Sequence, residues 1–275
     1  MKISIVTPSF NQGRFLPDCL RSVLDNARKM GPACGVEHFV IDACSTDETR
    51  RVLEEWSREH PASDPQSSPA SYSFHYTSEP DKGQTDAINK GFRKTSGDWV
   101  MWLNADDYLL PGALEKLVAF AALHPGADVI YGDCRFVDEQ GNSIREKREG
   151  GFDPGMLLFY GCYIPSTATF YHRRVLDRGL YLDASYKVCM DFEYYVRLLA
   201  EGCRFLHLPS TLACFRWHGT NVSSVYAQKR SEERLQVQRW YLERKGRVWM
   251  AREWLLAILF RAYQAKRLAG RLLRR

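Results

Sequence analysis

The stretch Ser78 to Pro111 reads SEPDKGQTDAINKGFRKTSGDWVMWLNADDYLLP and carries most of the information about the fold. It joins a polar loop that contains glycine, a segment with helical character, the apolar run Trp99 to Leu103 and the acidic turn from Asn104 to Asp107. Carboxylates crowded at the end of a buried strand repel each other and are poorly solvated, so they need a counter-charge. A divalent metal that carries phosphate would supply this charge, and the stretch therefore predicts a metal and phosphate site.

The composition is that of an ordinary globular protein. The 275 residues are 45% hydrophobic and 26% charged, which suffices for one substantial core with a small appendage. The formal net charge is +5, but the basic excess lies at the end of the sequence. From Arg244 onward there are ten basic residues and a single acidic one, Glu253, so the body before that point is slightly acidic.

The cysteines and the apolar runs bear on where in the cell the protein is expected. Eight cysteines are scattered without any C-x-x-C pair, which favours a reduced, cytoplasmic protein, although their even number leaves disulfides formally possible. The first residues after Met1 are typical of a strand rather than a signal peptide. The most apolar late run, Trp254 to Phe260, is too short to cross a bilayer, so we expect no transmembrane segment.

Strand-like and helix-like patterns alternate through the first half of the chain. The runs predicted as strands are Ile3–Val6, His38–Ile41, Ser73–Tyr76, Trp99–Leu103 and Val129–Tyr131. The segments predicted as helices are Arg14–Lys29, Thr46–Glu59, Thr85–Lys94 and Gly112–Leu123. Ser45 or Thr46 is expected to cap the second helix, and Pro111 to occupy the first turn of the fourth. This alternation predicts an α/β fold with a mostly parallel central sheet flanked by helices.

The second half of the chain follows a different pattern. In the first half, the segment His60–Ser71, with three prolines and four serines, is predicted to be a solvated loop between units. After Gly132 the predicted elements are a hairpin of Cys134–Val137 and Ser143–Lys147, strands at Ser166–Tyr171 and Arg204–Arg216, and a helix at Met190–Glu201. From Tyr226 the chain is predicted to be helical and basic to its end.

Polar residues follow the first two predicted strands. Ligands of open α/β sheets bind beyond the carboxyl ends of the strands, so these residues are candidates for ligand contact. Thr7 and Asp42 are suited to hydrogen bonds with a base and a ribose. For Asp42 we favour a ligand contact, because a carboxylate directly after a buried strand is costly without a partner.

Five pieces of the sequence resemble the family 2 glycosyltransferases. They are ISIVTPSFNQ from Ile3, VIDACSTDET from Val40, EPDKGQTDAINKG from Glu79, LNADDYLLPGAL from Leu103 and MDFEYYVRL from Met190. Together they cover about the first 200 residues in the order of that family, and the combination is more specific than any single piece. The resemblance implies a nucleotide-sugar-binding α/β domain of the GT-A (Rossmann-like) type. It would span residues 1–220, with a nucleotide-sugar half at 1–110, an acceptor half at 111–220 and a basic amphipathic helical extension at 221–275.

The resemblance also implies roles for individual donor-side residues. Asn104-Ala105-Asp106 lies where the family carries its D-x-D motif, so Asp106 would hold a metal, while Asn104 brings no charge but can bond a ribose hydroxyl. Asp107 is left open between a second metal ligand and a turn residue. The remaining donor-side residues would be Thr7, Pro8 and Asp42 around the nucleoside, with Lys82, Gln84 and Asp86 closing over it.

The metal and the base follow from the chemistry of transfer. A hard ion such as Mn²⁺ or Mg²⁺ prefers oxygen ligands and neutralises a departing diphosphate, so no acid is needed for the leaving group. His218 could contact the metal or the diphosphate, or be a structural histidine. Asp191 lies where the resembling family carries its catalytic base, with Met190 in place of a first carboxylate. Asp191 and Glu193 point to different sides of a helix, so only one can face the site, and we choose Asp191 over a role that only stabilises the helix dipole.

We therefore expect an inverting, metal-dependent glycosyltransferase. The donor would be a nucleotide-diphosphate sugar, with UDP the first choice, and the acceptor a hydroxyl of a glycan or lipid-linked molecule in cell-surface polysaccharide or glycolipid synthesis. One alternative is a sugar-nucleotide pyrophosphorylase, which would need a Gly-rich basic loop that Thr7 to Gly13 lacks. Another is a non-catalytic nucleotide-sugar or glycan-binding protein, with Asn104 and Met190 marking lost carboxylates.

Three other features have open interpretations. The tail combines Trp249, Trp254, Leu255, Ile258 and Leu259 with arginines, which suits the anionic inner surface of a membrane, although its apolar face could pack on the domain instead. No nucleic-acid recognition module accompanies these basic residues. Trp99 and Trp102 are expected in the core, and Gly161–Ser166 is either a connecting loop or part of an acceptor pocket.

Overall fold

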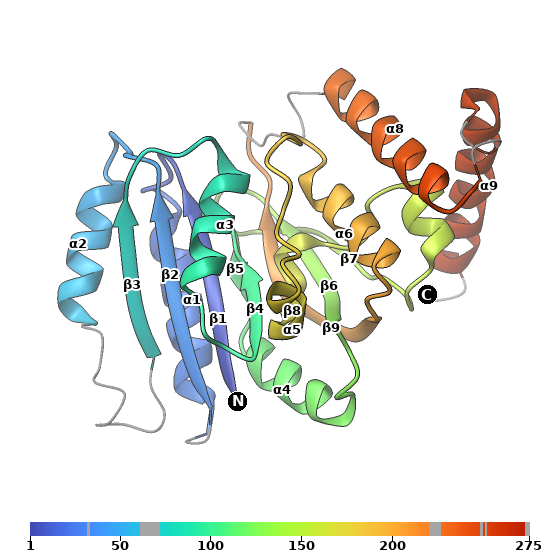
Figure 1. Ribbon diagram of the computed structural model, residues 1–275. Helices are drawn as coiled ribbons and strands as arrows, with labels where there is room; N and C mark the ends of the chain where they lie inside the picture. The colour runs from blue at the N-terminus through green and yellow to red at the C-terminus, as the bar shows by residue number, and fades with distance from the viewer. Residues whose placement is uncertain (32–33, 61–71, 220–226, 248–249, 251, 273–275) are drawn as a thin grey trace.

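The computed structural model describes residues 1–31, 34–60, 72–219, 227–247, 250 and 252–272. One mixed sheet runs through the molecule in the order β3-β2-β1-β4-β8-β6-β9-β5, and β7 pairs with β6. Helices cover the sheet, and the C-terminal helices α8 and α9 lie together beyond its second half (Figure 1). The expected α/β fold with a sheet flanked by helices is confirmed.

The elements have the following bounds. The strands are β1 Lys2–Ser9, β2 Gly35–Asp42, β3 Tyr72–Ser78, β4 Trp99–Trp102, β5 Tyr108–Leu109, β6 Val129–Val137, β7 Ser143–Lys147, β8 Thr169–His172 and β9 Phe205–Arg216. The helices are α1 Leu16–Lys29, α2 Thr49–Glu59, α3 Gln84–Lys94, α4 Ala113–Leu123, α5 Arg173–Asp177, α6 Met190–Ala200, α8 Ala227–Arg244 and α9 Glu253–Leu272. Two short turns are the π-helical η1 Met156–Tyr160 and the 3₁₀ η2 Ser166–Ala168.

The first half of the sheet is parallel. Strand β1 pairs with β2 from Lys2 opposite Gly35 to Ser9 opposite Asp42, and β2 and β1 pair in the same sense with β3 and β4. Strand β8 then runs antiparallel between β4 and β6, and β9 runs parallel to β6. The carboxyl ends of β1 to β4 therefore meet at one edge, and the loops that follow them lie side by side.

Several boundaries differ from the expectations. Helix α2 begins at Thr49 and not at Thr46, because the residues before it serve the loops described below. Helix α4 begins at Ala113, after Gly112 with φ of 78°, so Pro111 lies before the helix and not in its first turn. The segment Ser166–Ala168 is a 3₁₀ turn and only the residues from Thr169 form a strand. Most of the expected solvated loop, residues 61–71, lies outside the described residues.

Strand β4 is buried on both faces. Val100 and Trp102 pack in the cluster that α3 and α6 cover, while Trp99 and Met101 pack in the cluster that α1 and α4 cover. The Trp102 ring stacks on Tyr171 with centroids 5.4 Å apart and both rings buried. The expectation that both tryptophans belong to the core is confirmed, and β4 holds its C-terminal turn in a fixed place.

The C-terminal helices pack on the second half of the domain. Helix α8 contacts α6, and α9 contacts η1. Within the described ranges, no helix combines the length and the apolar character needed to cross a bilayer. The eight cysteines all lie in these ranges as free thiols.

Candidate active site

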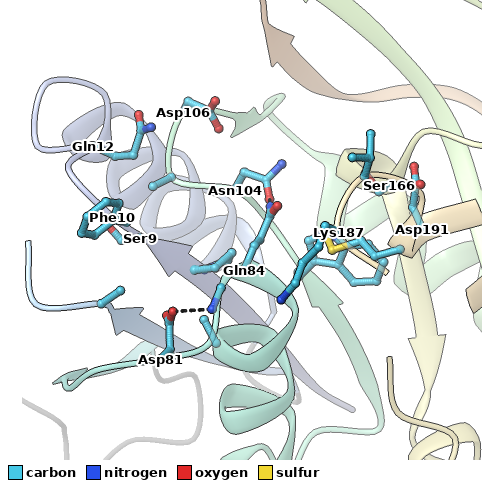
Figure 2. Close-up of a pocket in the computed structure, with 18 of the residues that line it drawn as sticks. Ser9, Phe10, Gln12, Asp81, Gln84, Asn104, Asp106, Ser166, Lys187 and Asp191 are labelled. Carbon is cyan, nitrogen blue, oxygen red and sulfur yellow. Dashed lines mark hydrogen bonds between the residues drawn. The ribbon is translucent and has the colours of Figure 1, made fainter. Parts of the chain in front are cut away.

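A cavity of about 680 Å³ opens at the carboxyl edge of β1, β2 and β4. It has two sides, which Figure 2 shows facing each other. One side, here named the loop wall, consists of Pro8, Ser9, Phe10, Gln12, Ala43, Cys44, Pro80, Asp81, Gly83, Gln84, Asn104, Ala105 and Asp106. The other, the helix wall, consists of Ser166, Lys187, Val188, Met190 and Asp191. The lining is completed by Ala87 of α3, Trp102 of β4, Phe215 near the end of β9 and His218 just beyond β9.

Short hydrogen bonds join the loops after β1 and β2. The Asn11 backbone N–H donates to Ser45 Oγ at 2.8 Å, and the Thr46 N–H donates back to Asn11 Oδ1 at 2.8 Å. The Gly13 N–H donates to Asp47 Oδ2 at 2.9 Å, and a Cβ at Gly13 would lie only 2.5 Å from the backbone nitrogen of Thr49, the first residue of α2. The loop wall is therefore preformed, and only glycine fits at position 13 without a shift of the backbone.

Two of the expected nucleoside residues lie behind the loop wall and do not line the cavity. The Asp42 carboxylate is fully buried and accepts hydrogen bonds from the Ser45 backbone and from Ser78 Oγ at 2.6 Å. Thr7, also fully buried, pairs with His38 Nε2 at 2.9 Å. Asp42 does have the partners that its burial requires, but they are protein groups, and Ser45 serves it instead of capping α2.

Two residues that line the cavity carry buried polar atoms. They are Ser9 and Trp102, whose Oγ and Nε1 are buried without a hydrogen-bond partner in the described part of the chain. Buried polar atoms in native proteins are almost always paired, so unpaired ones at a cavity mark places for polar atoms of a ligand. Phe10 stands beside Ser9 with 59% of its surface exposed, an open aromatic face at the same edge (Figure 2).

The segment after β3 contributes some of its expected residues. Gln84 Nε2 donates to Asn104 Oδ1 at 2.7 Å, which joins two lining residues. Lys82 and Asp86 do not line the cavity: the Asp86 carboxylate instead accepts the Lys82 backbone N–H at 3.1 Å and lies 3.7 Å from Lys90 Nζ. Asp86, in the first turn of α3, thus fixes the segment that leads into the helix.

The neighbouring carboxylates Asp106 and Asp107 point to different surroundings. Asp106 lines the cavity, and its Oδ2 lies 2.8 Å from Nε2 of His218, whose ring stacks on Phe15. Asp107 is buried and accepts hydrogen bonds from Thr167 Oγ1 at 3.0 Å and the Arg216 backbone at 2.9 Å. Burial and the charge of Asp106 raise the pKa of Asp107 well above its usual value. Asp107 joins β9 and η2 to the acidic turn and does not line the cavity.

The lining residues fit a divalent metal with few protein ligands. Asp106 and His218 present one carboxylate and one imidazole at the same point of the cavity. In the described ranges, no three His, Cys, Asp or Glu side chains come together as a metal cluster. A metal at this point would take its other ligands from phosphate oxygens and water, which is the usual arrangement for Mg²⁺ in phosphate sites.

Asp191 is the carboxylate of the helix wall. It is half-buried at the start of α6, where its Oδ1 accepts the Phe192 N–H at 2.7 Å and its Oδ2 accepts the Cys162 thiol at 3.4 Å. Burial raises the pKa of Asp191 above its usual 3.8. Glu193 instead forms a buried ion pair with Arg197 at 2.6 Å. The helix thus turns Asp191 to the cavity and Glu193 away from it.

The comparisons with known proteins agree with this geometry. The model named Glycosyl transferase family 2 matches residues 4–190. The chain belongs to glycosyl transferase family 2. Its curated relatives include the PGL/p-HBAD biosynthesis glycosyltransferase of Mycobacterium bovis, 29% identical over 210 residues that cover 74% of this chain and 73% of that protein. Chondroitin synthase of Escherichia coli is 23% identical over 249 residues, 89% of this chain but 33% of that protein.

Solved structures show the same fold. TarS of S. aureus, residues 1–349 in complex with UDP-GlcNAc, superposes with a TM-score of 0.66 at 17% identity, over 89% of this chain and 66% of that one. The mannosyltransferase PcManGT of Pyrobaculum calidifontis, in complex with GDP-Man and Mn²⁺, has a TM-score of 0.61 at 15% identity over 97% of this chain and 75% of that one. The fold of this family 2 glycosyltransferase is therefore GT-A.

The sequence did not reveal one residue of the helix wall, Lys187, and one residue that supports this wall from behind, Glu233. Lys187, labelled in Figure 2, is the one lysine or arginine among the described lining residues, and its Nζ donates to the Lys82 carbonyl at 3.0 Å. Glu233 of α8 is buried, and its carboxylate accepts the backbone N–H groups of Lys187, Val188 and Cys189 at 2.8–3.0 Å. No motif marks either residue, because Lys187 lies in an irregular segment and Glu233 acts across 44 to 46 positions of sequence.

Proposed function

We propose that this family 2 glycosyltransferase transfers a sugar with inversion from a nucleotide-diphosphate donor, UDP in the first instance, to a hydroxyl group. The acceptor would be a glycan or a lipid-linked molecule in cell-surface polysaccharide or glycolipid synthesis. The observation that carries the proposal is that two groups of side chains line opposite sides of one cavity: Asp106 with His218 on one side, and Asp191 on the other. Family membership favours this reading over the pyrophosphorylase and the non-catalytic binding protein.

The loop wall suits the nucleoside. Phe10 offers an exposed ring on which a base can stack, and Ser9 Oγ offers a buried hydroxyl without a partner in the described chain. The joined amides of Gln84 and Asn104 belong to the same wall and suit the ribose hydroxyls. Thr7 and Asp42 support this surface from behind, with Asp42 holding Ser45 in the loop after β2.

Asp106, His218 and Lys187 suit the diphosphate. Asp106 and His218 would hold Mn²⁺ or Mg²⁺, which when bound neutralises the charge of the departing diphosphate. Lys187 adds a fixed positive charge from the helix wall. Position 104 is Asn, so the site has one carboxylate fewer than the D-x-D pattern to bind the metal, and Lys187 supplies a positive charge that does not depend on the metal.

Asp191 suits the acceptor. Its ionised carboxylate would accept the proton of the acceptor hydroxyl while that oxygen forms the bond to the anomeric carbon. The bond from the anomeric carbon to the diphosphate breaks at the same time, and the nucleotide diphosphate leaves with the electron pair. Attack from the side opposite the diphosphate inverts the anomeric centre. The raised pKa of Asp191 makes its carboxylate a stronger base than an ordinary aspartate.

Thermal stabilisation by nucleotide diphosphates tests the proposal. Purified protein is heated with UDP, GDP, CDP or ADP, each with and without Mn²⁺. Ligand at about 100 times its Kd adds about 2.7 kcal/mol to the stability of the protein, so one nucleotide is expected to raise Tm, and to raise it more with Mn²⁺. The matching nucleotide sugar should then be hydrolysed slowly without acceptor. If no nucleotide diphosphate raises Tm, the donor site is wrong; if binding occurs without any turnover, the protein is a binding module.

A further inference from the structure

Helix α9 has two different apolar faces. Its inner face carries Leu256, of which 4% is exposed, and Tyr263. Its outer face carries Trp254, Ile258 and Leu268, which are 60%, 56% and 56% exposed. At 100° per residue these three positions fall within roughly 80° of one another, so they form one stripe along the helix. The outer face adds mostly alanines between them.

The inner face is fixed on the domain. Arg267 makes two hydrogen bonds of 2.9 Å to the Glu149 carboxylate, and both side chains are almost fully buried. Tyr263 packs on Gly155, where a Cβ would lie only 2.1 Å from its hydroxyl oxygen. Helix α9 therefore cannot turn its outer face inward without breaking a buried ion pair, and that stripe is a lasting feature of the surface.

Three exposed arginines without an ion pair in the described residues lie on α9 or in the segment before it. Arg247, Arg252 and Arg261 are exposed and make no ion pair within the described part of the chain. Arg261 lies within the apolar stripe, between Ile258 and Leu268. Three described basic side chains of the same part of the chain do form ion pairs. They are Arg244 with Glu201, Lys266 with Asp153 and Arg267 with Glu149. The only acidic residue from 244 onward is Glu253.

We propose that the outer face of α9, defined by Trp254, Ile258, Arg261 and Leu268, docks on an anionic membrane surface. An exposed tryptophan with aliphatic residues suits the interface between headgroups and acyl chains, and free arginines suit anionic headgroups. A second copy of this chain is a poorer partner, because the same face on both copies would bring like charges together. The sequence offered two alternatives for the tail, membrane binding or packing on the domain. In this proposal α9 does both: its inner face packs on the domain and its outer face binds the membrane.

A chain of contacts links α9 to the helix wall. Glu149 also lies 3.5 Å from Lys147 Nζ, which donates to the Tyr163 carbonyl at 2.7 Å. The neighbouring Cys162 thiol contacts Asp191. Docking would therefore hold the wall that carries the base in a fixed relation to the lipid surface, where a lipid-linked hydroxyl is presented. This consequence rests on the proposed function, whereas docking itself does not.

Flotation with liposomes tests the docking. The full chain is mixed with vesicles of phosphatidylcholine alone or with added phosphatidylglycerol. The variants carry point substitutions, because deleting α9 would also remove its inner face from the core. The test variant is Trp254→Ser with Ile258→Ser and Leu268→Ser, and its matched control is Leu123→Ser with Ile144→Ser, two side chains 77% and 54% exposed on other elements. A second pair compares Arg261→Glu with Arg21→Glu, an exposed arginine of α1.

The unaltered chain is expected to float with anionic vesicles, and less at high salt. The triple variant should lose about tenfold in partition, Arg261→Glu at least about fivefold, and both controls should match the unaltered chain. Equal flotation of the triple variant and its control would overturn the proposal. So would equal binding to neutral vesicles, or a chain that stays unbound and forms dimers through this face. Tm of the nucleotide-bound protein, measured on each variant, separates this outcome from a failure of the proposed donor site.

Discussion

The two walls of the cavity are held in place by different means. The loop wall is joined by bonds between neighbouring strand ends, such as the Asn11 N–H to Ser45 Oγ and the Gly13 N–H to Asp47. The helix wall depends on distant elements: Glu233 of α8 holds the backbone before α6, and Lys147 of β7 supports the segment that contacts Asp191. Local motifs therefore suffice for the first wall, while the second needs the packing of the whole C-terminal half.

The largest effect is expected at the base of the helix wall. Asp191→Asn keeps the shape of the side chain but removes the group that accepts the proton. The transfer rate should fall by roughly 10²- to 10⁴-fold, the usual contribution of a positioned general base. Glu193→Gln is the matched control, because that carboxylate is paired with Arg197 away from the cavity. A loss as large in the control, or none in Asp191→Asn, would remove Asp191 from the chemistry.

The next effect concerns the support of the helix wall. Glu233→Ala leaves three backbone N–H groups without their acceptor, and the free energy of unfolding should fall by about 2–4 kcal/mol. Glu232→Ala removes an exposed neighbour on the same helix and should stay within about 0.5 kcal/mol of the unaltered protein. Urea unfolding measures both. Equal stability of the two variants would show that α8 is a mere appendage to the site.

Substitutions of Lys187 test whether its positive charge contributes to nucleotide-diphosphate binding. A charged hydrogen bond to a phosphate contributes about 1.5–3 kcal/mol, so Lys187→Ala should weaken nucleotide-diphosphate binding roughly 10- to 150-fold. Lys187→Arg should restore most of it, and Lys116→Ala, an exposed lysine of α4, should change nothing. Calorimetric titration gives the affinities. If Lys187→Ala binds as tightly as the Lys116 control, the lysine belongs to the acceptor side or to neither.

The smallest effect is a shift of a pH profile. Burial raises the pKa of Asp191 and the Cys162 thiol lowers it, so Cys162→Ala should raise it further. The base works ionised, so activity is lost as pH falls through this pKa. The acid limb of kcat/KM in Cys162→Ala should therefore lie at higher pH, while Cys162→Ser, which keeps a donor, should stay closer to the unaltered enzyme. A limb that moves to lower pH would contradict the contact.

Sequence could predict the parts of the site that follow a strand or a helix directly. Asp106 follows β4 in the acidic turn and Asp191 lies at the start of α6. The family resemblance pointed to both residues, and both line the cavity. Asp42 was expected in the cavity because its burial needs a partner, but Ser78, 36 positions away, supplies one. Distance along the chain hides such partners, as it hid Glu233.

The C-terminal helix α9 is a second case in which the sequence alone did not identify the contacts of a residue. The pattern of α9 contains enough apolar residues for two faces, so sequence alone offered membrane or domain as alternatives. Only the packing on Gly155 and Glu149 shows which residues face inward. Trp249, which the sequence analysis grouped with them, lies outside the described residues.

Nucleotide binding with and without Mn²⁺, in two variants, tests the division of the cavity most directly. The nucleotide diphosphate that stabilises the protein best is titrated calorimetrically into the unaltered protein, Asp106→Asn and Asp191→Asn. Mn²⁺ should strengthen binding to the unaltered protein and to Asp191→Asn equally, and should give no gain in Asp106→Asn, because only that change removes a ligand of the metal. Two results would contradict the account: Mn²⁺ strengthens binding to Asp106→Asn as much as to the unaltered protein, or Asp191→Asn loses the gain. In either case the metal and the base would not lie on separate walls of the cavity.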